Sequence, residues 1–586
     1  MPRRTSAAST RRPVWPWVVG GLVLVGTAAV GVFAWDAVQI KAATDALATH
    51  ARAARQAIAD SDVDALRAEV AEVEREADVF AAATDGPHWW VAARTPWVKD
   101  QVVPVVEAAR AVEKMAIGAL TPLAGMDDLA ALAAPEVVDS RLDPYLFEPY
   151  REALAQASVA LDEADARLSG VDLDNTIVVV ADAYREVEQQ VGAVHHLVQG
   201  AHVAAEVFPS MLGADGKRRY LVMVQNNAEP RTTGGIPGAV IELAVNDGRL
   251  SIGRYASASS MVVIEGVGGL TEDEARIFGD LMEVYPHDVN FTPEFPRSAE
   301  MMTRFWDAKF SEHVDGVLSI DPVALGWMLE GAAPVELGPF TVGSDNLAKV
   351  MLNETYFAFE EPTEQDAFFT RASSVFFGEV LAGDGSTLAG IERGIDAGRV
   401  MLWSADPDVQ VLLGSTAIGG EFLSRTDAMG LFLNDGSESK IGWYIDTETT
   451  VVDHLCTDGS LGGQTVELKL THTYEGAVAA LPDYVSGGDV AVPAGEFHTN
   501  VLLYPAVGMG VTKFTRDGVE AGLSPESHDV RTLATARVAL QPGQSTTLSF
   551  EITANSRDVE PPVLVETPGP KPNVYTRTAD ALVDGC

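Results

Sequence analysis

The residues best suited to chemistry lie in one stretch, YLVMVQNNAEPRTTGGIPG, from Tyr220 to Gly238. Tyr220 to Val224 is an apolar run of the length of a buried strand, and amides, charges and hydroxyls follow at once. Sheet proteins often place binding groups at strand ends, glycines allow a close backbone approach, and Arg231 offers a planar fork that suits phosphate or carboxylate. The candidate ligand-binding residues of this 226–235 cluster are Asn226, Asn227, Glu229, Arg231, Thr232, Thr233, Gly234 and Gly235.

The same stretch has a purely structural interpretation. Asn and Thr side chains often hydrogen-bond their own backbone in turns, and Arg231 could pair with Glu229 two residues away. The sequence leaves both interpretations open, because each one accounts for the amides and the glycines equally well.

Length and charge limit the class of protein. At 586 residues the chain exceeds what one hydrophobic core supports, so we expect two to four domains. Lys and Arg number 41 against 84 Asp and Glu, which gives a formal net charge of −43. Such an excess of negative charge repels phosphate backbones, so we expect no nucleic-acid partner.

The first residues predict a membrane anchor. Residues 13–35 carry no charge and are long enough to cross a bilayer as a helix, and four arginines lie within residues 1–12. The positive-inside rule makes residues 1–12 a cytoplasmic basic tail and places the rest of the chain outside the cell membrane, as in a single-pass protein. A cleaved signal peptide is the alternative, but the apolar stretch is long for one.

That location bears on the two cysteines, Cys456 and Cys586. Disulfides form and persist in oxidising spaces such as the cell exterior. A disulfide between these two residues, which would fix the C-terminus, is therefore a reasonable hypothesis.

The composition and the apolar–polar patterning of successive regions predict a multidomain α+β fold. Residues 36–212 are rich in Ala and Glu and predict a helical stalk, with an apolar stripe at Leu66, Val70, Val73, Ala77 and Phe80. Residues 213–446 mix strand-like and helix-like runs, which indicates an α/β domain, and Asp247-Gly248 is typical of a hairpin turn. Residues 447–586 alternate apolar and polar positions between Pro and Gly turns, which predicts an antiparallel β-sandwich.

A string of motifs carries a resemblance to a known family. NNAEPRTTGGIPG, VNDGRL, DVNFTPEFPRSAEMM, DGVLSIDP and DGSESKIGWYI follow one another along the chain. Together they closely resemble a bacterial membrane-anchored family defined as a domain of unknown function, and the resemblance extends over most of the chain from about residue 60. That family implies no established activity.

A remoter resemblance does imply an activity. The order of an anchor, a strand, an Arg-containing turn, a hairpin and an Asp-bearing strand is similar to LytR-CpsA-Psr phosphotransferases, which move glycopolymers from a polyprenyl carrier to the cell wall. This resemblance implies ligand-binding roles for Arg231 and Asn290, and for Asp321 at the end of the Asp-bearing strand. Phosphoryl transfer also needs cations, so Arg254 and Arg297 become candidates, and Mg²⁺ becomes a possible cofactor under this interpretation alone.

The sequence contains one further enzyme-like motif, and it is incomplete. Ser437-Glu438-Ser439-Lys440 matches Ser-x-x-Lys, but the companion motifs of that enzyme class are missing, so we interpret it as a turn. No metal site is predicted.

The preferred hypothesis is an anchored envelope protein that binds an anionic glycan or a lipid-linked precursor. The alternatives are a divergent LytR-CpsA-Psr-like transferase and a structural partner in a membrane complex, so the sequence leaves open whether the protein is an enzyme.

Overall fold

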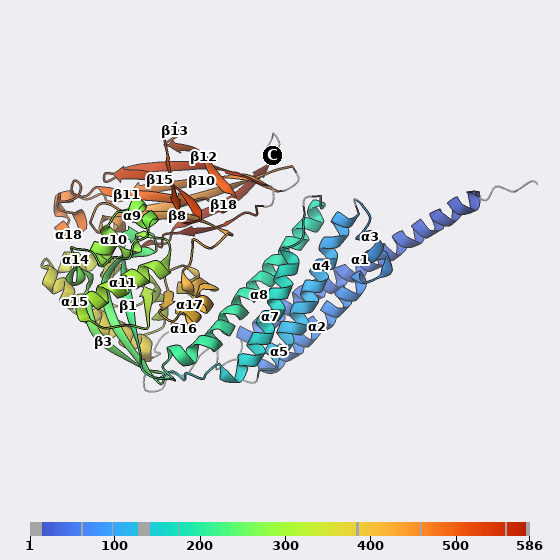
Figure 1. The fold of residues 1–586 in the computed structure, drawn as a ribbon, viewed down its shortest axis with the longest axis horizontal. Helices are drawn as coiled ribbons and strands as arrows, with labels where there is room; N and C mark the ends of the chain where they lie inside the picture. The colour runs from blue at the N-terminus through green and yellow to red at the C-terminus, as the bar shows by residue number, and fades with distance from the viewer. Residues whose placement is uncertain are drawn as a thin grey trace, which may run out of the picture. The chain divides into compact units, whose positions relative to one another are not determined.

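The chain divides into two compact units, drawn in the computed structural model of Figure 1. One unit comprises Met1–Leu129 and Tyr150–Gln199, and the other comprises Ala130–Pro149 and Gly200–Cys586. The structure describes residues 15–59, 62–96, 98–126, 141–173, 175–382, 386–457, 460–556 and 559–581.

The first unit is built of helices, as predicted for this part of the chain. The apolar stripe of α2 from Leu66 to Phe80 is buried, and Val73, Ala77 and Phe80 pack against Ala43 of α1 and Ala109 of α4. Alanines at these contacts let the helices approach closely, so small side chains fill the core. The helices are α1 (Trp15–Ala59), α2 (Val63–Thr84), α3 (Pro87–Ala92), α4 (Lys99–Met115), α5 (Thr121–Ala124), α7 (Arg151–Leu168) and α8 (Val178–Met211), whose last turns belong to the second unit.

The predicted membrane span at residues 13–35 lies largely outside the described residues. Residues 13 and 14 are not described, and the side chains of α1 are described only from residue 31 onward. Within the described part of the chain, no helix is both long and apolar enough to cross a bilayer. The anchor therefore stays a prediction.

The second unit begins with a five-stranded mixed sheet in the order β3-β2-β1-β4-β7. Strand β1 pairs with β2 in antiparallel fashion and with β4 in parallel, and side chains of β1 alternate between two cores. Leu221 and Met223 face Phe305 and Trp306 of α11, whereas Val222 faces the helices α12 and α15. The elements are β1 (Arg218–Arg231), β2 (Gly234–Asn246), β3 (Arg249–Ser257), η4 (Pro286–Phe291), α9 (Glu272–Phe278), α11 (Phe295–Phe310), β4 (Gly316–Ile320), α12 (Pro322–Met328), α15 (Pro362–Ala382) and β7 (Met401–Ser404).

Strand β1 is longer than its sequence predicted. The apolar run ends at Val224, but the strand continues to Arg231, with register shifts after Val224 and after Asn226, and returns as β2 from Gly234. The polar cluster therefore forms the tip of a hairpin instead of a loop beyond a strand. Glycine makes this possible, because a Cβ on Gly235 would lie 2.2 Å from the carbonyl oxygen of Asn226.

The C-terminal part is a sandwich of two sheets, in the orders β13-β12-β16-β10-β9-β18 and β14-β15-β11-β8-β17. Apolar residues of both sheets, such as Leu431, Val466, Val501 and Phe550, share one core. The strands are β8 (Ala428–Asp435), β9 (Ile445–Leu455), β10 (Leu461–His472), β11 (Phe497–Tyr504), β12 (Met509–Arg516), β13 (Val519–Glu520), β14 (Ser524–His528), β15 (Arg531–Leu540), β16 (Ser545–Ala554), β17 (Val563–Glu566) and β18 (Val574–Ala581).

Two features of the sandwich differ from expectation. Strand β8 precedes the predicted boundary at residue 447, yet it lies within a sandwich sheet. The prediction of an antiparallel sandwich is wrong for the edge strands β17 and β18, which run parallel to β8 and β9, because the C-terminal segment returns along both sheets. Cys456 at the end of β9 is disulfide-bonded, and Cys586 lies outside the described residues, so their pairing stays a hypothesis.

Two Asp-Gly hairpin turns of the second unit make a matched test of steric contact. Both glycines have positive φ, 72° for Gly248 and 76° for Gly518. A Cβ on Gly248 would lie 1.7 Å from the carbonyl oxygen of Leu142, whereas nothing lies within 4 Å of one on Gly518. Gly518→Ala should cost about 1 kcal/mol from backbone strain alone. Gly248→Ala should lower the thermal unfolding midpoint clearly further, and equal shifts in calorimetry would contradict the contact.

Candidate functional site

The 226–235 cluster is buried where the tip of the β1–β2 hairpin meets strand β8 of the sandwich. Asn227, Glu229, Arg231, Thr232 and Thr233 are each at most 7 % exposed. The side chain of Asn434 on β8 accepts hydrogen bonds from the backbone N–H and the hydroxyl of Thr232, at 2.9 and 3.1 Å. Residues far apart in the sequence, such as Thr232 and Asn434, thus lie in contact at the hairpin tip.

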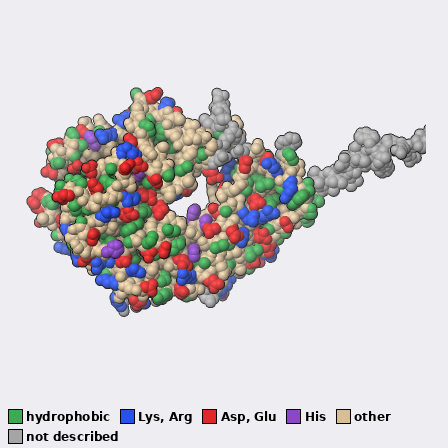
Figure 2. Space-filling model, viewed as in Figure 1, with side chains coloured by type: hydrophobic (Ala, Val, Ile, Leu, Met, Phe, Trp, Pro, Cys, Tyr) green, Lys and Arg blue, Asp and Glu red, His purple; other side chains and the backbone are tan. Residues whose placement is uncertain are grey.

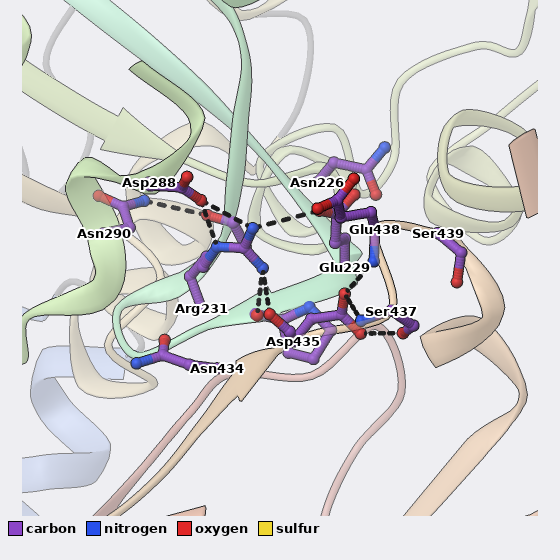
Figure 3. A network of polar contacts seen from close by, with 12 residues as sticks. Asn226, Glu229, Arg231, Asp288, Asn290, Asn434, Asp435, Ser437, Glu438 and Ser439 are labelled. Atoms are coloured by element: carbon purple, nitrogen blue, oxygen red, sulfur yellow. Dashed lines mark hydrogen bonds and ion pairs between the residues drawn. The ribbon is translucent and has the colours of Figure 1, made fainter. Parts of the chain in front are cut away.

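Arg231 is the centre of this region (Figure 3). A guanidinium group has five N–H donors, and five hydrogen bonds leave Arg231. Nε and Nη2 donate to Asp288 at 3.3 and 2.9 Å, and Nη2 also donates to Glu229 at 3.2 Å. Nη1 donates to the carbonyl oxygens of Pro230 and Asp435, at 3.2 and 3.4 Å. The donor capacity of Arg231 is therefore used within the protein.

Glu229 joins Arg231 to a second buried cation. Its Oε1 accepts from Arg231, and its Oε2 accepts from Nζ of Lys440, which lies 5.5 Å from the ring centre of Tyr484. Burial opposes ionisation of Glu229, but the charges of Lys440 and Arg231 outweigh it and lower the pKa of Glu229. Burial likewise opposes the charge of Lys440, and Glu229 reverses the effect, so the pKa of Lys440 is raised. The ion pairs with Glu229 thus favour the charged forms of both Lys440 and Arg231.

Two further carboxyl groups complete what we call the buried-charge network: Glu229, Arg231, Asp288, Asp435 and Lys440. Asp435 accepts hydrogen bonds from the backbone N–H groups of Ser437 and Glu438, each at 2.9 Å, and from the Ser437 hydroxyl. Burial, and then repulsion by Glu229, raises the pKa of Asp435 to about 7. Burial also raises the pKa of Asp288 despite Arg231. Three carboxyl groups thus face two cations, and the surplus acid is the group that binds a proton most readily.

The remaining amides hold a second polar group beside the network. Asn227 donates to Asp321 at 3.0 Å and to the carbonyl oxygen of Pro568 at 2.9 Å, and Arg399 pairs with Asp321. Asp321 also caps α12 by accepting from the N–H of Ala324 at 2.8 Å. These contacts tie β1 to the C-terminal segment, so Asn227 and Asp321 have structural partners.

Other candidate residues are used in similar ways. Asn226 donates to the Tyr356 hydroxyl at 2.7 Å, and Asn290 donates to the carbonyl oxygen of Gly235 at 3.0 Å. A Cβ on Gly234 would lie 2.0 Å from Oε1 of Gln225, so this glycine too serves close packing. The buried hydroxyl of Thr233 has no hydrogen-bond partner among the described residues.

The structure does not bring Arg254 and Arg297 to Arg231. Arg254 pairs with Glu312 at 3.1 Å on the surface, and Arg297 pairs with Glu274 at 2.8 Å and with Glu300. The cations that phosphoryl transfer would require are therefore engaged in separate ion pairs. Among the described residues, no group of three or more His, Cys, Asp or Glu is placed to hold a metal ion.

The sequence analysis missed Asp288, Asp435 and Lys440 as members of this site. Lys440 belongs to the Ser-x-x-Lys stretch that we interpreted as a turn, and its amine is protonated and paired, which is unsuited to a general base. The available signal was the position of all three residues in the motifs DVNFTPEFPRSAEMM and DGSESKIGWYI. The motifs contain these charged residues, but their sequence does not show which residues pair.

Residues 215–356 match a family model described as a protein of unknown function (DUF4012). This stretch is thus a domain of unknown function, and it runs from the start of β1 to Tyr356. The match covers less of the chain than the resemblance from about residue 60 suggested. It contains Glu229, Arg231 and Asp288 but not Asp435 or Lys440, so the buried-charge network extends beyond it. No curated protein and no solved structure matches the chain.

Truncating one side of the network should be costly. Lys440→Met leaves Glu229 buried with one cation fewer, so we expect a loss of about 3–5 kcal/mol of stability. Lys513→Met is the matched control, because Lys513 pairs with Glu551 at 2.6 Å with both side chains about half exposed, and it should cost less than about 1 kcal/mol. Thermal unfolding of the purified protein would measure both. Similar shifts in the two variants would contradict the buried pairing.

The raised pKa of Asp435 predicts a pH dependence with a definite sign. The folded protein binds this proton up to about pH 7, whereas the unfolded chain releases it near the ordinary value of 3.8. Unfolding free energy should therefore fall as pH rises from 3.8 to about 7 through this group. Asp435→Asn should remove that slope when unfolding midpoints are compared across the range. The control is Asp446→Asn, at an exposed ion pair with Lys571, and it should keep the slope of the unmodified protein.

Proposed function

We propose that this protein is a single-pass protein of the cell envelope whose outer part is a non-catalytic scaffold for partners in a membrane complex. The observation that carries the proposal is the closed state of the 226–235 cluster. Arg231 is 4 % exposed, and its donors are used by Glu229, Asp288 and backbone carbonyls. An anionic ligand would have to displace two buried carboxyl groups, so the cluster is better suited to holding two domains together.

Two features support the location. Arg3, Arg4, Arg11 and Arg12 precede the uncharged residues 13–35, which is the charge pattern of a helix with its N-terminus in the cytoplasm. Cys456 is disulfide-bonded, and structural disulfides belong to oxidising compartments. Both features favour an outer part that lies beyond the cell membrane.

Binding of an anionic glycan or of a lipid-linked precursor receives less support. The net charge is −43, and Figure 2 shows Asp and Glu side chains scattered over the visible face with Lys and Arg between them. Such a surface offers an anion little general attraction. A LytR-CpsA-Psr-like transferase, with Mg²⁺ as its possible cofactor, would need Arg231, Arg254 and Arg297 to act on one phosphate group, and their ion pairs are separate.

Binding of a polyprenyl pyrophosphate separates these functions. We expect the detergent-solubilised protein to show no saturable binding that depends on Arg231, with or without Mg²⁺, because that guanidinium is enclosed. Arg231→Lys, which cannot reproduce the forked contacts, should instead lower the thermal unfolding midpoint. Isothermal titration and calorimetry on the same samples give both readouts. Saturable binding that Arg231→Lys abolishes without a change in the unfolding midpoint would favour the transferase.

A further inference from the structure

Helix α1 leaves an apolar stripe uncovered where the predicted membrane span ends. Phe33 and Ile40 lie in one apolar cluster with Trp89 and Val102, so this side of α1 packs inside the helical unit. Trp35 lies on another side of the helix and is 67 % exposed. Because α1 is one unbroken helix from Trp15 to Ala59, Trp35 has a fixed relation both to the predicted span and to the helical unit.

Helix α3 is fastened beside this point. The carboxylate of Asp36 accepts a hydrogen bond from Nε1 of Trp89 at 3.0 Å and pairs with His88. The ring of Phe33 makes edge contacts with the rings of both residues, at centroid distances of 5.2 and 4.9 Å. Figure 1 shows α3 next to α1 where α1 leaves the bundle of helices. These contacts fix α3 at the level of Asp36, directly after the predicted span.

The fastening of α3 exposes its other apolar side chains. Trp90 and Val91 are 61 % and 56 % exposed, although their neighbour Trp89 is buried. The guanidinium of Arg94 lies over the Trp90 ring, 4.1 Å from its centre. An exposed tryptophan that carries an arginine on one face combines apolar surface with a positive charge that suits lipid phosphate.

A third segment brings apolar side chains to the same end of the unit. The loop before α8 is bound to the start of α4: the Thr176 hydroxyl donates to the carbonyl oxygen of Asp100 at 2.7 Å, and the N–H of Ile177 donates to Gln101 at 2.8 Å. Val102, the next residue of α4, packs in one apolar cluster with Trp89. Exposed apolar residues continue from this loop into α8, namely Ile177, Val178 and Val179.

We propose that these exposed side chains form an apolar collar that rests in the headgroup layer of the membrane. The collar consists of Trp35, Trp90, Val91, Ile177, Val178 and Val179. The inference rests on the proposed anchor at residues 13–35. Its partner is the lipid bilayer surface, because three separate segments present apolar groups at the level where the predicted span ends. The headgroup layer is about 5–7 Å deep on each side of the hydrocarbon, enough to hold one ring of such side chains.

The collar gives the helical unit a second attachment to the bilayer. A single spanning helix fixes height but leaves tilt to be set by flanking interfacial groups. Aromatic side chains at the interface on α1 and α3, with the start of α8 beside them, would restrict how far the helical unit can tilt. The collar thus orients the helical unit relative to the membrane.

Photo-crosslinking to lipid tests this proposal in the full-length protein. A benzophenone-bearing amino acid replaces Trp90 or Val178 in protein reconstituted into phosphatidylcholine–phosphatidylglycerol vesicles, and mass spectrometry identifies the adducts after illumination. The control position is Leu197 on α8, which is 67 % exposed, and its neighbour Val198 packs with Ala119 and Ala157 in a different cluster. We expect lipid adducts at positions 90 and 178 and no lipid adducts at position 197.

The outcomes separate the collar from the anchor. Alkaline carbonate extraction of the same vesicles reports the anchor, and release of the protein would overturn the proposed membrane attachment itself. Retention of the protein without lipid adducts at positions 90 and 178 would overturn the collar alone. Adducts to a second protein chain at these positions in place of lipid would also overturn it, because a protein partner would then cover the surface. Equal lipid adducts at position 197 would overturn the collar, because lipid contact would then not be confined to these side chains.

Discussion

The second unit depends on the bridge that Glu229 makes between Arg231 and Lys440. Each of these three groups is buried, and an unpaired charge in such a place costs several kcal/mol. Arg231 and Glu229 come from β1 and Asp288 from the η4 turn. Asp435 is the last residue of β8, and Lys440 lies in the turn that follows β8. Glu229 and Arg231 pair within β1, but Asp288 and Lys440 reach them from other elements, so the α/β sheet and the sandwich stabilise one another.

This arrangement explains why polar residues crowd the hairpin tip. A purely apolar seam could hold the sheet and the sandwich together in several registers, whereas ion pairs with fixed donor directions permit one. Buried ionic groups retained for specificity are known from some systems. Here Thr232 donates two hydrogen bonds to Asn434 and Arg231 donates one to the carbonyl oxygen of Asp435, and these contacts join the hairpin tip to β8. The surplus carboxyl group, Asp435, has a raised pKa because it is buried beside Glu229.

The helical unit is held together mainly by the packing of small apolar side chains. Its core uses alanine and valine at close helix contacts, and Asp36 joins α1 to α3 through His88 and Trp89. That tie buries one tryptophan and exposes the next, so a polar interaction determines where apolar surface remains open. The exposure of Trp90 and Val91 is thus a consequence of how α3 is held against α1.

Much of the architecture follows from local pattern. The helical periodicity between residues 63 and 84, the Asp247-Gly248 turn and the strand alternation beyond residue 447 each depend on neighbouring residues, and each agrees with the structure. The continuation of β1 through its polar residues, the recruitment of β8 and the parallel edge strands depend on partners far away in the chain. No local pattern contains that information.

The sequence by itself determined the residue types available to the site: an arginine, amides and glycines in one short stretch. Only the tertiary structure decided their role, because the role of a charged group depends on what surrounds it. Arg231 beside water would be a ligand-binding fork, but with Asp288 at 2.9 Å and Glu229 at 3.2 Å in a buried seam it is a structural cation. Glu229 lies only 2 residues from Arg231 in the sequence. Asp288 lies 57 residues from Arg231, and Lys440 lies 211 residues from Glu229, so only folding brings these groups together.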